Sequence, residues 1–231
     1  LEFYQRRTAA SPKTDSSIVA KAHMAVGKAL EKLKRLEEAD DQVDSALRIF
    51  TRTVGDSSPL TANALGTLGR IRVARGMKPE GAELSRRALE LEVGKDAFHL
   101  ETVWELLTLL KDVYTKLSQS RCAREKSHPA RLHVLGEVFA PLLPLMQSAD
   151  VRIKALARSD EGISDIGTTA VFYKTAGEAA LMAQDYDRGR AYLRTAIDYF
   201  DKVRGFDCGS LKSGCRELLR IAEMNSPTTG R

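Results

Sequence analysis

The chain has 231 residues, of which 43% are hydrophobic and 29% charged, and 36 Lys and Arg against 31 Asp and Glu give a formal net charge of +5. Hydropathy excludes a membrane-spanning helix, because no run of about 18 apolar residues is present. Three cysteines are too few for a disulfide-rich scaffold. Acidic residues alternate with the basic ones, so nucleic acid is a minor alternative as a ligand.

Residues 1–15 are predicted to form a flexible arm. They carry Arg6, Arg7 and Lys13 with Ser and Thr and few acids, a composition typical of the end of an organellar transit segment. A solvated tail or a cloning remnant has the same composition. A chloroplast or mitochondrion and the cytoplasm therefore both stay open as compartments. The chain starts at Leu1 rather than at a methionine, and we expect that something upstream was removed or cleaved.

Small residues recur at a fixed interval along the chain. Two sets lie 42 positions apart: Gly27, Ala39 and Ala46, then Gly69, Gly81 and Ala88. Small side chains are needed where two helices cross closely, and such an interval is typical of stacked helical repeats. A third repeat has Lys111 in place of the glycine. A fourth follows an insertion of 24 residues and contains Gly177, Gly189 and Ala196.

Apolar periodicity predicts an antiparallel helix pair in each repeat. The expected helices are 16–34 (capped by Ser16 or Ser17) and 36–52, then 59–75 and 79–93, then 100–117 with a partner that breaks near Ser127 and restarts at Pro129, and finally 164–182 and 186–204. Pro141 and Pro144 should divide the apolar stretch 132–146, ahead of a short helix at 148–158. A loop at 205–214 is expected to precede a capping helix at 218–224.

The predicted fold class is therefore all-α, a right-handed α-solenoid of about four antiparallel helix pairs with a terminal capping helix. The predicted domains are the arm at 1–15, a repeat domain at 16–204 with an insertion at about 131–162, a loop and capping helix at 205–225, and a tail at 226–231.

The repeats resemble the tetratricopeptide repeat family, which places a large residue and then Gly midway along its first helix. The matching pairs are Val26-Gly27, Leu68-Gly69, Leu110-Lys111 and Ala176-Gly177, and the 42-residue period is most similar to the longer repeats of kinesin light chains. The resemblance covers roughly 16–203 and implies a general protein-interaction scaffold without enzymatic activity. Met24 and Lys28 stand where chaperone-binding members need Lys and Asn, so that carboxylate clamp is absent.

The residue patterns typical of catalysis and of cofactor or metal binding are missing. The four histidines are scattered, and none has the spacing of a metal-ligand pair. Cys208 and Cys215 could form a disulfide in an oxidising compartment or stay free thiols in a reducing one. The acidic cluster of Glu37, Glu38, Asp40, Asp41 and Asp44 is interpreted as a solvated helix face.

Two candidate interaction sites follow from the pattern. If the resemblance holds, the first helix of each pair lines the concave surface, and four residues make its first half basic: Lys21, Lys28, Asn63 and Arg70. An ordinary solvated helix face is the alternative. The apolar insertion supplies a predicted docking patch of Leu135, Val138, Phe139, Leu142 and Leu143, with internal core as the alternative.

Three hypotheses for function stay open at this point. The first is a non-enzymatic scaffold or accessory subunit in a larger assembly, such as an organellar membrane-protein complex contacted peripherally. The second is an adaptor that captures an acidic peptide in the basic groove. The third is an RNA-binding helical-repeat protein.

Overall fold

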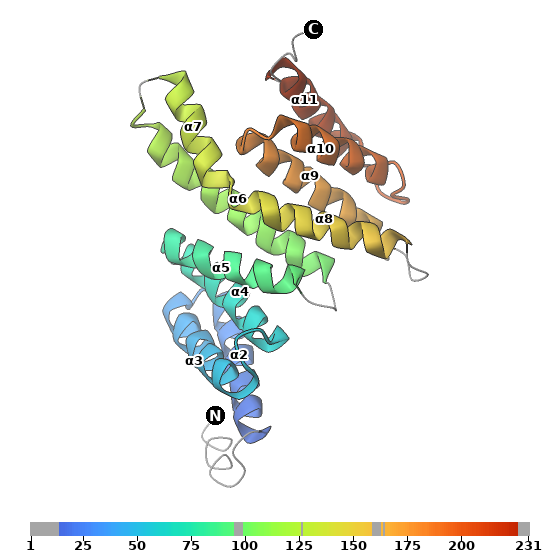
Figure 1. The fold of residues 1–231 in the computed structure, drawn as a ribbon. Helices are drawn as coiled ribbons and strands as arrows, with labels where there is room; N and C mark the ends of the chain where they lie inside the picture. The colour runs from blue at the N-terminus through green and yellow to red at the C-terminus, as the bar shows by residue number, and fades with distance from the viewer. Residues whose placement is uncertain (1–13, 95–98, 126, 159–162, 164, 226–231) are drawn as a thin grey trace. The chain divides into compact units, whose positions relative to one another are not determined.

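The computed structural model describes residues 14–94, 99–125, 127–158, 163 and 165–225. Every regular element in these ranges is an α-helix, so the predicted all-α class is confirmed (Figure 1). The chain divides into two compact units, Leu1–Lys95 and Asp96–Arg231. None of the described helices is long and apolar enough to cross a lipid bilayer. The predicted arm, except for its last two residues, and the predicted tail lie outside the described residues.

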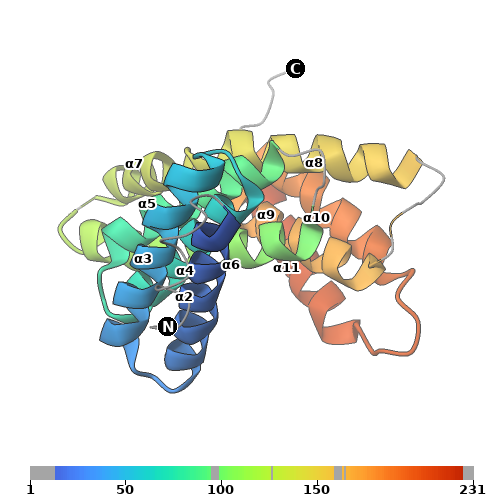
Figure 2. The same cartoon turned by 90° about the horizontal axis from the view of Figure 1, so that it is seen from below.

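Unit 1 consists of two antiparallel helix pairs that pack on each other. The first pair is α2 (Thr14–Lys32) with α3 (Leu36–Val54), and the second is α4 (Pro59–Ala74) with α5 (Lys78–Val93). The partners of each pair lie side by side in both views (Figures 1 and 2). The predicted cap at Ser16 or Ser17 is wrong, because α2 already begins at Thr14. The core of unit 1 joins α3 to α4, where Val43 and Phe50 cluster with Leu68 and Ile71.

The recurring small residues lie where the two helices of a pair cross. A Cβ atom built on Gly69 would lie 2.8 Å from the carbonyl oxygen of Gly81 on α5. In the fourth repeat a Cβ on Gly177 would lie 2.7 Å from Cγ of Leu193. No real Cβ approaches another atom so closely, which explains why glycine recurs at these crossings. Ala46, Ala88 and Ala196 are fully buried.

A residue with positive φ ends the first helix of three repeats, seven positions after the motif glycine. These residues are Lys34 (φ 62°), Gly76 (φ 91°) and Gln184 (φ 62°). At the first of them, Arg35 N–H donates to the Leu30 carbonyl and Lys34 N–H to that of Glu31, both at 3.0 Å. The same two hydrogen bonds recur after α4 and after the corresponding helix of the fourth repeat. This arrangement is the Schellman motif, in which a left-handed residue closes a helix tightly.

Unit 2 contains the third and fourth repeats and the terminal helix. Its helices are α6 (Leu100–Cys122), α7 (His128–Phe139), α8 (Leu142–Arg158), α9 (Ile166–Met182), α10 (Tyr186–Phe200) and α11 (Gly209–Asn225). The expected restart after Ser127 is confirmed, since the Ser127 hydroxyl accepts the Ala130 N–H at 3.3 Å and Pro129 lies in the first turn of α7. The chain bends between α7, which packs on α6, and α8, which lies alongside α9 (Figure 1).

Two expectations about the second half of the chain are wrong. The helix expected at 148–158 already begins at Leu142, because Pro144 lies in the first turn of α8, where its missing N–H has no intrahelical partner to lose. The expected division of the apolar stretch near Pro141 and Pro144 is confirmed, since α7 ends at Phe139. Residues 209–214 are helical rather than a loop, since α11 begins at Gly209, whose N–H binds the Asp207 carboxylate at 2.8 Å. The glycines suggested a loop. The buried side of α11 instead carries Cys215 and Ala222, both fully buried.

Candidate functional site

The four residues predicted to line a basic groove lie on adjacent first helices of unit 1. Lys21 and Lys28 are exposed on α2, and Asn63 and Arg70 are exposed on α4. On each helix the two residues are seven positions apart, or about two turns, so they share a face. Because the repeat length is 42, Lys21 is equivalent to Asn63 and Lys28 to Arg70. The residues therefore form two parallel rows of equivalent positions.

Arg70 differs from the two lysines, because it already binds a carboxylate. Its Nε and Nη2 atoms donate to the two carboxylate oxygens of Glu31 on α2, at 2.7 and 3.0 Å. The Arg70 side chain keeps 45% of its surface exposed, whereas that of Glu31 keeps 19%. Such a bidentate pair fixes the guanidinium plane. Arg70 therefore links α4 to α2. Because its charge is already paired, Arg70 contributes less positive charge to the groove than the sequence suggested.

Lys21 and Lys28 make no ion pair with any residue of the described part of the chain. Lys32, one turn beyond Lys28, is also exposed and was missed by sequence reasoning. Spacing could have identified Lys32, because it extends the Lys21–Lys28 row along α2. The face thus carries three cations on α2. Their role in binding a partner stays a prediction.

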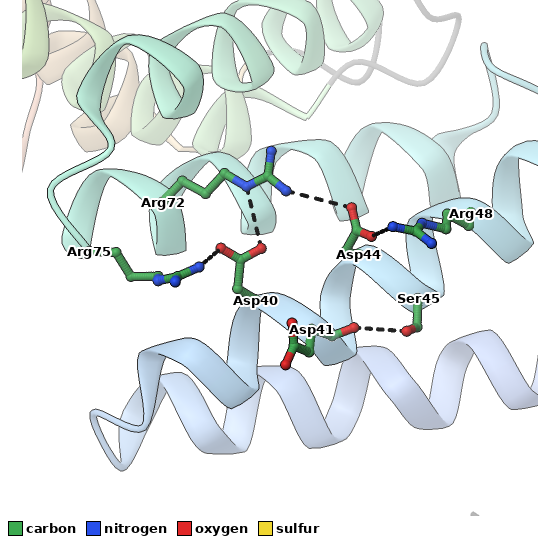
Figure 3. Close-up of polar contacts among 7 residues, drawn as sticks. All are labelled: Asp40, Asp41, Asp44, Ser45, Arg48, Arg72 and Arg75. Carbon is green, nitrogen blue, oxygen red and sulfur yellow. Dashed lines mark hydrogen bonds and ion pairs between the residues drawn. The ribbon is translucent and has the colours of Figure 1, made fainter.

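An ion-pair network around the buried Asp40 carboxylate links the two helix pairs of unit 1 (Figure 3). The Asp40 carboxylate on α3 accepts from Arg72 Nε at 3.3 Å and from Arg75, both near the end of α4. Asp44 pairs with Arg48 at 2.7 Å and with Arg72 at 3.6 Å. The interpretation of this acidic cluster as a solvated face is therefore wrong for Asp40, whose side chain is 7% exposed. Removing one partner of a buried pair leaves an uncompensated charge, so this network specifies how the pairs stack.

An open hollow of about 600 Å³ lies beside this network, between the α2–α3 turn and the end of α4. Its charged rim is largely paired. Arg35 donates to both Glu38 carboxylate oxygens at 2.6 Å, and Arg75 is held by Asp40. The hollow therefore offers few unpaired charges to a ligand, in contrast to the lysine row on α2.

The predicted docking patch lies largely inside unit 2. Phe139 and Leu142 are fully buried, so their side chains present no surface to a partner. Phe139 packs edge-to-face on Tyr114 of α6, with ring centroids 5.9 Å apart. Leu135, Val138 and Leu143 are half-buried. The apolar insertion therefore serves mainly as core, because α7 and α8 cover α6 and α9.

Lys111, which replaces the motif glycine of the third repeat, binds the fourth repeat. Its Nζ lies 2.6 Å from the Glu178 carboxylate on α9, and Lys174 holds the other carboxylate oxygen. Burial raises the pKa of Glu178, but the hydrogen bonds from Lys111 and Lys174 outweigh burial and leave that pKa lowered. At the position where the other repeats have the motif glycine, the third repeat therefore has a lysine that forms an ion pair between α6 and α9.

A second polar link holds the insertion to the fourth repeat. The Tyr173 hydroxyl donates to Asp150 of α8 at 2.7 Å, and Lys154 binds the same carboxylate at 2.8 Å. Tyr173 also stacks on Tyr199, with ring centroids 5.7 Å apart. Burial and the adjacent carboxylate raise the pKa of Tyr173. The arrangement is a structural anchor, because both groups are fully committed to each other.

No cluster of three His, Cys, Asp or Glu side chains suited to a metal ion occurs in the part of the chain that the structure describes. Cys208 and Cys215 are buried free thiols, one just before α11 and the other on it. Burial raises the pKa of the Cys215 thiol, which lowers its reactivity as a nucleophile.

Comparisons with known proteins agree with this architecture. Residues 18–91 match a family model described as tetratricopeptide repeat. A crystal structure of BtubC (BKLC) from P. vanneervenii is similar over 100% of this chain and 90% of that one, with 14% identity and a TM-score of 0.57. A structure of putative kinesin light chain TPR-like repeats from Podosopora anserina covers 83% of this chain and 99% of that one, with 13% identity and a TM-score of 0.39. A search of curated proteins gave no match.

Proposed function

We propose that unit 1 captures an acidic segment of a partner protein, because residues 18–91 match the tetratricopeptide repeat family, whose repeats serve as protein-interaction scaffolds. Lys21, Lys28 and Lys32 on α2 would supply the positive charge. The observation that carries the proposal is the contrast between Lys28, which has no carboxylate partner in the described chain, and its equivalent Arg70, which binds Glu31.

The spacing of the lysines indicates the form of the acidic segment. Seven residues along a helix correspond to about 10 Å. A peptide in the polyproline II conformation covers this distance in about three residues, at roughly 3.1 Å each, and its residues three apart lie on the same face. A segment with acidic residues three apart can therefore place one carboxylate near Lys21 and the next near Lys28.

Proteins of this family are generally non-enzymatic, and we propose the same for this chain. The polar groups of unit 2 support this view. Glu178 is held between two lysines, and Asp150 between Tyr173 and Lys154. A carboxylate so fully engaged is a poor general base, because proton transfer would break its structural contacts.

A titration with a fluorescently labelled peptide carrying Glu at every third position tests the proposal. The double change Lys21→Glu with Lys28→Glu should weaken binding by about tenfold or more, because two attractions become repulsions. Salt should weaken binding to the unchanged chain. The matched control is Lys116→Glu with Arg216→Glu, which alters net charge equally at exposed positions of unit 2.

Equal weakening by both double variants would refute the proposal, because binding would then follow net charge rather than the groove. An RNA oligonucleotide that displaces the peptide, with a steep linear dependence of log affinity on log salt, would favour the RNA-binding alternative.

The permanent-subunit alternative keeps Leu135, Val138 and Leu143 as its candidate contacts. It predicts that Leu135→Ser with Leu143→Ser abolishes association with a larger assembly, an organellar membrane complex for example, while the thermal unfolding midpoint stays unchanged. A large fall in the midpoint would assign these side chains to the core instead.

A further inference from the structure

One side of α2 is an apolar stripe with nothing packed over it in the described chain. Ile18 is 43% exposed, Val26 37% and Leu33 67%. Ala25 and Ala29 lie between them and are exposed, and Ala22 is half-buried. We define this stripe as the stacking face, formed by Ile18, Ala22, Ala25, Val26, Ala29 and Leu33. Its small alanines allow the backbone of another helix to approach closely.

The equivalent face of the second repeat shows which kind of element packs on such a stripe. The positions 42 residues after Ala22, Val26 and Ala29 are Ala64, Leu68 and Ile71 on α4. All three are almost fully buried and belong to one core cluster with residues of α3, the second helix of the preceding repeat. In the second repeat this face is thus covered by an amphipathic helix. In the first repeat the equivalent face is open.

Charge indicates how the helix on the stacking face must differ from α3. Arg75, which binds the buried Asp40 of α3, is equivalent to Leu33. A helix on the stacking face therefore needs an apolar residue, not a carboxylate, opposite Leu33. Arg70 binds Glu31 of the preceding first helix, and its equivalent Lys28 has no carboxylate partner among the described residues. The carboxylate that pairs with Arg70 comes from a first helix and not from α3, so an incoming helix would have to carry carboxylates along its own edge to pair with Lys28.

We infer that the stacking face binds an amphipathic helix of a partner protein, with an apolar stripe over Ile18, Val26 and Leu33 and carboxylates along its edge nearest Lys21 and Lys28. This surface shares its lysine edge with the groove of the proposed function, but the main contact is made by the apolar residues of α2. The partner helix would extend the stack of unit 1 by one layer, in the way that α3 covers α4.

A synthetic peptide with the sequence of residues 36–54 and the change Asp40→Leu is a suitable probe, because α3 covers the equivalent face of α4. Its binding to the full chain can be followed by fluorescence anisotropy. The unmodified peptide is its control. We expect the modified peptide to bind about tenfold more tightly than the unmodified one, because Asp40 would lose its hydration opposite Leu33 without gaining a cation.

The double change Ile18→Asp with Leu33→Asp should weaken binding of the modified peptide by about tenfold or more, with an unchanged thermal unfolding midpoint. The matched control is Val151→Asp with Phe206→Asp, which replaces two apolar residues of unit 2 that are 60% and 69% exposed and should leave binding unchanged. The acidic extended peptide should still bind a chain with Ile18→Ser and Leu33→Ser, which adds no negative charge beside the lysines, so failure of one proposal is separable from failure of the other.

Three results would overturn the inference. Equal binding by the Ile18→Asp, Leu33→Asp chain would place the peptide elsewhere. A dimer of the unchanged chain that this double variant disperses would assign the face to a second copy, as sedimentation would show. Binding that occurs only after removal of residues 1–13 would assign the face to that segment.

Discussion

Replacing Gly69 by alanine tests the close crossing of α4 and α5 most directly. Two opposing effects apply. Alanine is more favourable than glycine within a helix by about 1 kcal/mol. The new Cβ, however, would lie 2.8 Å from the Gly81 carbonyl oxygen and 3.0 Å from the Ser85 backbone nitrogen, both closer than the 3.4 Å at which ordinary contact begins.

The steric effect should be the larger one. These two atoms belong to the backbone of α5, so neither can move without shifting the whole helix. The nearest atom is the Ser85 Oγ, which would have to turn away from the Gly81 carbonyl to which it donates a hydrogen bond. Overpacking of a core costs typically 1–3 kcal/mol, and this site lies at the upper end because two of the three obstructing atoms belong to the backbone. We therefore expect Gly69→Ala to lower the free energy of unfolding by about 1–2 kcal/mol net, after the gain in helix propensity.

The control for this experiment is Gly214→Ala, because Gly214 lies inside α11 and a Cβ there would meet nothing within 4 Å. That variant should gain about 0.5–1 kcal/mol. Urea unfolding followed by circular dichroism measures both, and in a unit of this size 1 kcal/mol shifts a thermal midpoint by about 4–8 °C. If Gly69→Ala stabilises the chain as Gly214→Ala does, the helices are not in the close contact described.

Two further predictions concern the polar links of unit 2. The lowered pKa of Glu178 means that its contribution to stability is present above the unfolded-state pKa of about 4.3 and is lost as pH falls through the folded-state value, so Glu178→Gln should flatten the fall of the unfolding midpoint below that pH. Tyr173→Phe should cost about 1.5–3 kcal/mol in urea unfolding, because Asp150 loses a buried donor, and Asp150→Asn in the same background should then cost less than it does alone. The first assignment would be contradicted if the unfolding midpoint depended on pH in the same way in Glu178→Gln as in the unchanged chain. The second would be contradicted if the losses of the two single variants added up in the double variant.

The helix pairs could be predicted because a close helix crossing requires small residues, and their regular recurrence is visible in the sequence. Gly69 and Gly81 face each other, so neither position accepts a side chain, and the close approach recurs at Gly27 in the first repeat and at Gly177 in the fourth. The start of α7 was also predictable, since Ser127 and Pro129 act within one turn of each other. Local steric rules of this kind operate between neighbours or at a fixed repeat interval.

The charge pairs could not be predicted, because their partners are neither neighbours in the sequence nor one repeat interval apart. Asp40 appeared to be one acid of an exposed cluster, but Arg72 and Arg75 reach it from 32 and 35 residues away. Arg70 likewise appeared to be an unpaired charge, but it binds Glu31, which lies 39 residues earlier in the chain. Composition assigns a charged residue to solvent by default, and only the packed structure reveals which charges are paired. The three cations on α2 have no such partner among the residues that the structure describes.

The left-handed residue that ends the first helix in three of the repeats also explains which connection could accept an insertion. Lys34, Gly76 and Gln184 fix the length of their connections, because a Schellman turn leaves no slack between the paired helices. Ser118 occupies the same position in the third repeat but lies inside α6, which continues to Cys122. That repeat alone holds the inserted stretch. For protein engineering, the connection after Cys122 is therefore the place to graft a reporter domain, whereas the same graft at Lys34 would pull a helix pair apart.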